Sequence, residues 1–134
     1  MSSVLVNNEA GYAAAVNAFA DALWVSQNIT GNGFISPLSI NLAMLLTANG
    51  TANTTLQEIV TSLRLEGLQN MENVNIAAES LIRKLNSLAD RSASFVRIAN
   101  SIWIAPGAGN FKPDYAQRVA SRFSGIAEQL TSID

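Results

Sequence analysis

The sequence predicts a helix-rich α+β fold, with about five helices, one long strand and short extra strands. Apolar residues recur at helical spacing in several separate segments. The segment 95–104 is instead rich in the β-branched and aromatic residues that strands favour. Hydrophobic residues make up 49% of the chain and charged residues 13%, a balance typical of a folded core. A length of 134 residues fits a single domain, 1–134.

The first helix is expected at residues 9–27. Its apolar residues have the spacing i, i+3, i+4, i+7 and i+8 of one helical face: Val16, Phe19, Ala20, Leu23 and Trp24. Two glycines within 28–33 end this helix. Phe34 and Ile35 then predict a very short strand.

The second helix is expected at residues 37–49. Ser36 suits the N-cap, where its hydroxyl can accept a hydrogen bond from a free backbone amide. We expect it to be buried there, with its side chain bonded to the backbone or to Asn100. Pro37 suits the first helical position. The helix is apolar nearly all round, which predicts burial on all sides. Gly50 is expected to end it as a left-handed cap.

Two further helices are expected at residues 54–63 and 73–89. Thr54 and Gln57 have the spacing of a capping box at the start of the first. The second carries an apolar stripe of six residues: Val74, Ala77, Ala78, Leu81, Leu85 and Leu88. Both helices should therefore bury one face.

The best strand of the chain is expected at residues 95–104. Both of its alternating faces are apolar, which predicts a strand covered on both sides. Pro113 can begin a fifth helix at 113–123, with one face formed by Tyr115, Val119, Ala120 and Phe123. Residues 126–133 predict a short strand.

Composition excludes several classes of function. The net charge of -2 and the lack of a basic run predict no nucleic-acid partner, and no apolar run is long enough to predict a membrane partner. The chain has no Cys and no His, which excludes disulfides, thiol nucleophiles, the usual zinc sites and His-based triads. Its carboxylates are scattered, and neither Lys84 nor Lys112 has the Ser motif of a Ser–Lys pair. We therefore expect no enzyme, no cofactor and no metal.

Five motifs occur in a recognisable order. The segment 32–40 contains a seven-residue signature: Asn32, Phe34, Ile35, Ser36, Pro37, Ser39 and Ile40. A second motif at 50–59 follows it in register, and shorter ones lie at 19–23, 99–103 and 127–134. Together these segments resemble the serpin (serine protease inhibitor) family. Two residues depart from the family pattern: Asn49 stands where an apolar residue is usual, and Asn53 where glycine is common.

The resemblance implies that residues 1–134 form a serpin-like N-terminal domain or fragment, about the first third of the family fold. Serpins inhibit when a protease cleaves their reactive loop and the loop inserts into the large sheet as a strand. The resemblance covers only the first third of the family fold, and the reactive loop belongs to the remainder. We therefore expect this chain not to inhibit proteases alone. A serine or cysteine protease is an expected partner only if the rest of a serpin is present.

The alternative is a non-inhibitory protein-interaction or self-assembling serpin-like module. Its support is that the helix at 37–49 and the strand at 95–104 carry apolar surface that other parts of the chain or a partner must bury. We therefore expect a homo-oligomer or a complementary chain as partner.

The resemblance also implies roles for individual residues. Ser36, Ser39 and Asn100 match the shutter, a buried hydroxyl cluster beneath the sheet that governs its opening. The remaining motif positions have structural roles in the family: Asn32, Pro37, Gly50 and Thr55. Helix capping and turn formation explain Ser36 and Ser39 without any function, and a structural hydrogen bond explains Asn100; the residues themselves favour these simpler interpretations.

Two other features of the sequence bear on function. Four basic residues fall near the fourth helix: Arg83, Lys84, Arg91 and Arg97. Some serpins bind heparin on that helix, but a solvated face is favoured in an acidic chain. Sequons for N-glycosylation occur at Asn28, Asn49 and Asn53. The family favours an extracellular location, although residues 1–9 do not resemble a signal peptide.

Overall fold

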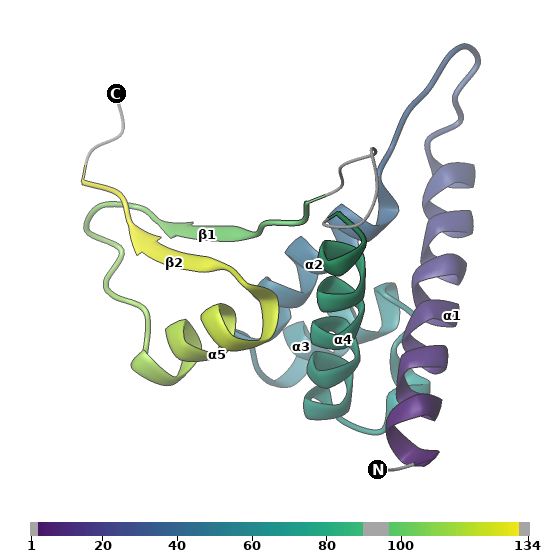
Figure 1. Ribbon diagram of the computed structural model, residues 1–134. Helices are drawn as coiled ribbons and strands as arrows, with labels where there is room; N and C mark the ends of the chain where they lie inside the picture. The colour runs from purple at the N-terminus through teal and green to yellow at the C-terminus, as the bar shows by residue number, and fades with distance from the viewer. Residues whose placement is uncertain (1–2, 90–96, 132–134) are drawn as a thin grey trace. The chain divides into compact units, whose positions relative to one another are not determined.

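The computed structural model describes residues 3–89 and 97–131 (Figure 1). The chain forms two compact units, Met1–Ala77 and Ala78–Asp134, whose boundary falls within one helix. The elements in chain order are α1 (Ser3–Ser26), α2 (Pro37–Ala48), α3 (Asn53–Ser62), the 3₁₀ turn η1 (Glu66–Leu68), α4 (Met71–Ala89), β1 (Ser101–Ile104), α5 (Pro113–Phe123) and β2 (Ile126–Gln129). The predicted helix-rich α+β fold is confirmed.

The first unit is helical. In it α1 packs against α2 and η1, and α2 packs against α3. The long loop that joins α1 to α2 extends beyond the end of α1 (Figure 1). The core of this unit combines residues of all its elements: Tyr12, Ala15, Leu42, Leu45, Leu46, Ala48, Ile59, Leu63, Leu65, Leu68, Val74 and Ala77.

Helix α1 buries the face that the pattern predicts only in part. It begins at Ser3, and Tyr12 and Ala15 are buried among the side chains that the structure describes on it. Gly11 allows α1 to lie close to η1, because a Cβ on residue 11 would lie 3.0 Å from Cδ2 of Leu68. Trp24, expected on the buried face, is 47% exposed, whereas the other four residues of that face are partly buried: Val16, Phe19, Ala20 and Leu23.

The predicted strand at Phe34 and Ile35 is wrong. The backbone there is irregular, and the Phe34 side chain is 92% exposed. A strand needs a neighbouring strand to satisfy its backbone groups, and the described part of the first unit contains none.

Helix α2 is less enclosed than expected. It buries Leu42, Leu45 and Leu46, whereas Ile40 is 39% exposed and Ala43 is exposed as well. The prediction of burial on all sides is therefore wrong for the chain as described. The helix ends where expected, but Gly50 does not adopt a left-handed conformation, and its amide donates to the Thr47 carbonyl at 2.9 Å.

Helices α3 and α4 lie within two residues of their predicted bounds. The predicted capping box is absent, because α3 begins at Asn53 after an N-cap at Ala52 that makes no side-chain bond. A cap forms instead before α4, where Oδ1 of Asn70 accepts from the Asn73 amide at 2.9 Å. Of the predicted stripe on α4, Val74, Ala77 and Ala78 are buried, whereas Leu88 is 59% exposed.

The second unit contains a βαβ arrangement. Strands β1 and β2 run parallel, with Ile102 opposite Ala127 and Trp103 opposite Glu128. Helix α5 connects them and packs against β2 (Figure 1). It begins at Pro113 as predicted, and Ser124 ends it in a left-handed conformation with φ 49°. Its buried side chains are Tyr115, Val119 and Phe123, but Ala120, expected beside them, is exposed.

The long predicted strand is shorter in the described residues. Phe95 and Val96 lie outside them, residues 97–100 form no ladder, and β1 begins at Ser101. Pairing with the four residues of β2 sets this length. The expectation that both faces are covered is wrong, because Trp103 is 50% exposed. The strand predicted at 126–133 ends at Gln129, and residues 132–134 lie outside the described part.

Candidate functional site

The two serines at the start of α2 form a hydroxyl pair. Oγ of Ser36 lies 2.8 Å from Oγ of Ser39, one helical turn away. Ser36 occupies the N-cap position as predicted, with φ -114° and ψ 90°, and Pro37 follows in the first turn. Its hydroxyl makes no capping bond, because Ser39 takes it as a partner instead. Both serines are exposed, so the expected burial of Ser36 and its capping bond are wrong for this chain.

Asn100 joins the start of the sheet to the end of α5. Its Nδ2 donates to the Phe123 carbonyl at 3.3 Å, and its own carbonyl accepts from the Ile126 amide at 3.1 Å. Gly125 permits the Asn100 carbonyl to lie close to the backbone after α5, because a Cβ on residue 125 would lie 3.1 Å from the Asn100 oxygen. Both bonds join Asn100 to backbone groups at the end of α5 and the start of β2.

The other motif residues lie on the surface of the first unit. Asn32 is exposed in the loop before α2, Gly50 follows that helix, and Thr55 is exposed in the first turn of α3. The structure therefore brings Ser36 and Ser39 together, with Pro37 next to Ser36 in the chain. Asn32, Gly50 and Thr55 lie apart from this pair.

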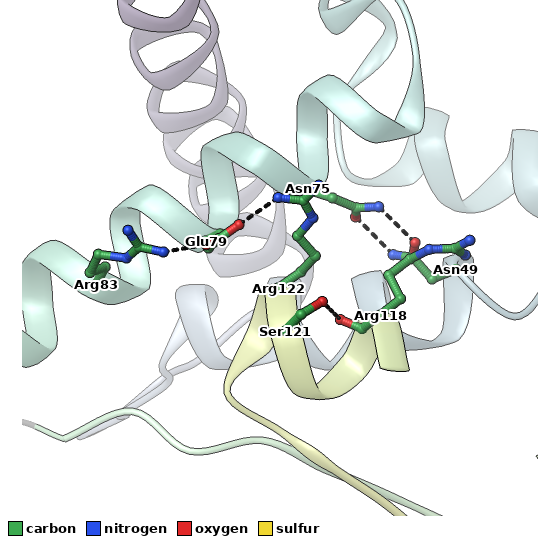
Figure 2. A network of polar contacts seen from close by, with 7 residues as sticks. All are labelled: Asn49, Asn75, Glu79, Arg83, Arg118, Ser121 and Arg122. Atoms are coloured by element: carbon green, nitrogen blue, oxygen red, sulfur yellow. Dashed lines mark hydrogen bonds and ion pairs between the residues drawn. The ribbon is translucent and has the colours of Figure 1, made fainter. Parts of the chain in front are cut away.

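Two asparagines of the first unit form a reciprocal amide pair (Figure 2). Nδ2 of Asn49 donates to Oδ1 of Asn75 at 2.9 Å, and Nδ2 of Asn75 donates to Oδ1 of Asn49 at 2.8 Å. Asn75 is 1% exposed. Sequence reasoning missed this pair, although Asn49 was recognised as standing in an apolar position.

A second polar contact is buried between α1 and α2. The Tyr12 hydroxyl donates to Oδ1 of Asn41 at 2.8 Å, and both side chains are buried. Nδ2 of Asn41 is buried without a hydrogen-bond partner among the described residues. Burial raises the pKa of the Tyr12 hydroxyl far above its ordinary value of 10.0, because the phenolate would lose its solvation.

An ion-pair cluster lies in the second unit (Figure 2). Glu79 pairs with Arg83 on the next turn of α4 and with Arg122 of α5, whose Nη1 lies 2.7 Å from Oε2 of Glu79. Arg83, Lys84 and Arg97 are exposed, as expected of a solvated face, and Arg91 lies outside the described residues. Glu79 thus ties α5 to α4 through one partly buried carboxylate.

A cavity of about 130 Å³ in the first unit is lined by Val60, Leu65, Glu66, Gln69, Asn70, Met71 and Val74. This lining has one carboxylate and no nucleophile beside a base. Within residues 3–89 and 97–131 there is no group of three potential metal ligands, and no helix has the length and hydropathy to cross a membrane.

The family model described as Serpin (serine protease inhibitor) matches residues 14–132. The chain belongs to the serpin family. The motifs at 32–40 and 50–59, with the hydroxyl pair and the parallel β1–β2 ladder, lie inside this match. Among curated proteins, none matches the chain at a significant level.

Solved serpin structures resemble the chain over nearly its whole length. An Arabidopsis serpin in its native stressed conformation has a TM-score of 0.69 and 20% identity, with 97% of this chain and 32% of that chain covered. Human glycosylated kallistatin has a TM-score of 0.72 and 19% identity, with 96% and 34% covered. A loop C-sheet serpin polymer has a TM-score of 0.66 and 27% identity, with 97% and 32% covered. The chain therefore spans about a third of the length of these serpins.

Proposed function

We propose that this chain supplies the N-terminal part of the scaffold of a protease-inhibiting serpin, and that the 134-residue chain alone neither inhibits proteases nor acts as an enzyme. The observation that carries the proposal is the match of residues 14–132 to the family. The described part of the chain supports it, because its sheet consists of β1 and β2 alone.

Inhibition by a serpin requires two parts that move. A reactive loop becomes a new strand, and a sheet opens between two of its strands to receive it. Each inserted backbone group needs a partner on either side. The two four-residue strands of the described sheet give one ladder and no pair of longer strands to flank an inserted loop. The inhibitory activity is thus proposed for a protein that contains this chain together with the rest of a serpin.

The Ser36–Ser39 pair fits a shutter role in that larger protein. Each hydroxyl can donate one hydrogen bond, and the contact between the two oxygens at 2.8 Å uses only one of these donors. One donor and further lone pairs remain available on an exposed surface at the start of α2. A strand laid over this helix would find partners for its polar groups there.

Incubation with a serine protease tests the lack of inhibition. The chain, in large molar excess over trypsin, chymotrypsin or elastase, should leave hydrolysis of a small chromogenic substrate linear and unchanged. A time-dependent loss of protease activity that survives dilution would contradict the proposal. An intact inhibitory serpin serves as the positive control.

A second candidate function is self-association through the small sheet. Three large apolar residues on or beside it are exposed: Trp103 at 50%, Ile126 at 53% and Leu130 at 37%. Each strand also has one edge without a ladder partner among the described residues. An exposed apolar sheet with open edges favours pairing with a second copy.

Two matched tryptophan variants test this association. Trp103 is 50% exposed on β1 and Trp24 is 47% exposed on α1, so both changes to Lys remove a similar exposed surface. In sedimentation velocity, the wild type should show a mass that rises with concentration, Trp103→Lys should stay monomeric, and Trp24→Lys should behave like the wild type. A wild-type monomer at high micromolar concentration, or equal effects of the two variants, would exclude association through β1.

A further inference from the structure

Three sequons of the same form occur in the first unit, at Asn28, Asn49 and Asn53, and each has Thr two residues later. The sequence alone therefore ranks them equally as acceptors for N-linked glycans. The structure distinguishes them by what each side-chain amide contacts.

The amide of Asn49 is fully engaged. Its Nδ2 donates to the Leu45 carbonyl at 2.9 Å and to Oδ1 of Asn75 at 2.9 Å, which uses both of its protons. Its Oδ1 accepts from Nδ2 of Asn75 at 2.8 Å (Figure 2). Thr51 of this sequon is engaged too, since its hydroxyl donates to the Ala48 carbonyl at 3.0 Å.

The amides of Asn28 and Asn53 are presented to solvent. Both residues are exposed, and both have left-handed backbones, with φ 49° and 53°. Within the described ranges of the chain, neither side-chain amide has a hydrogen-bond partner. Asn28 lies in the loop after α1 and Asn53 at the first position of α3, so a sugar attached to either would extend into solvent.

We propose that the folded chain accepts N-linked glycans at Asn28 and Asn53 and that folding closes the sequon at Asn49. In the transfer, Nδ2 forms a bond to C1 of the first sugar of a lipid-linked oligosaccharide pyrophosphate. The bond from C1 to the pyrophosphate oxygen breaks, the lipid pyrophosphate leaves, and one Nδ2 proton passes to a base of the transferase. At Asn49 that proton is one of the two that bond to Leu45 and Asn75, so modification there requires the Asn49 side chain to break at least one of these contacts first.

The test compares the folded chain with short peptides. The purified chain and three synthetic peptides, one around each sequon, are incubated with an oligosaccharyltransferase and a lipid-linked oligosaccharide, and the modified sites are mapped by mass spectrometry. All three peptides should be glycosylated. In the folded chain, Asn28 and Asn53 should react at rates near those of their peptides, whereas Asn49 should react at least about tenfold more slowly than its own peptide.

A variant distinguishes two reasons for a slow reaction at Asn49: protection of its amide by Asn75, or a local sequence that the transferase uses poorly. Asn75→Ala removes one partner of Asn49 and should raise the rate at Asn49 in the folded chain, with the rates at the other two sites unchanged. Circular dichroism checks that this variant retains its helices. If it does not, the proposal is judged on the wild type alone, by the ratio of the rate at Asn49 in the folded chain to the rate in its peptide. Glycosylation of Asn49 in the folded wild type at its peptide's rate, or failure of Asn28 and Asn53 to react there, would overturn the proposal.

Discussion

Replacing Phe123 by Ala should lower the free energy of unfolding by about 3–5 kcal/mol, the cost of removing a large aromatic side chain from a packed interior. Phe123 is the last residue of α5 and is 0% exposed. Its removal loses the transfer free energy of the ring and leaves a cavity that its surroundings fill only in part. The change should appear as a lower midpoint in urea denaturation followed by circular dichroism.

Phe34 provides the matched control, because the same substitution is made at a residue that is 92% exposed. Phe34→Ala should change the free energy of unfolding by no more than about 0.5 kcal/mol. Equal midpoint shifts for the two variants would show that α5 is not packed as described.

The pair of Tyr12 and Asn41 should give the second large effect. Tyr12→Phe removes the only described donor to Oδ1 of Asn41 and leaves a buried amide without partners, at a cost of about 1–3 kcal/mol. Adding Asn41→Leu removes the amide as well, with a side chain of similar shape. The double variant should therefore recover most of the loss, because no buried polar group of the pair is left unpaired.

The same pair predicts how stability depends on alkaline pH. The pKa of Tyr12 is raised in the folded chain, so the unfolded chain releases the proton more readily once the pH passes its ordinary value of 10.0. Stability should fall above that pH, and Tyr12→Phe should make the fall shallower. Some of the fall should remain, because burial also raises the pKa of Tyr115. An unchanged slope in Tyr12→Phe, or a double variant less stable than Tyr12→Phe alone, would contradict the buried contact.

The parts of the fold that follow from local pattern could be predicted from sequence. Helix α5 was predicted from Pro113 to Phe123, because proline marks its start and its buried residues recur every four positions. The segment at Phe34 and Ile35 has an apolar pattern but no strand, because a strand depends on a partner that the pattern does not reveal. Likewise, the exposure of Trp24 depends on where the rest of α1 packs.

A polar contact could be predicted from sequence only where its two residues are close in the chain and no other group nearby can take the place of one partner. Ser36 was placed correctly at the N-cap, yet its hydroxyl pairs with Ser39 because a second hydroxyl stands one turn away. The pair of Asn49 and Asn75 joins residues 26 positions apart, and no periodicity marks such a contact. Membership in the serpin family, in contrast, could be inferred from five short motifs in order, and the match over residues 14–132 confirms it.

The most direct test of the proposed role is a denaturing gel of the 134-residue chain mixed with a serine protease. An intact inhibitory serpin under the same conditions forms a covalent complex that survives denaturation. The chain alone should give only its own band, the protease and cleavage fragments, because the described sheet has no place for an inserted strand. A denaturation-resistant band at the summed mass of chain and protease would show that the chain inhibits without the rest of the fold and would contradict the proposal.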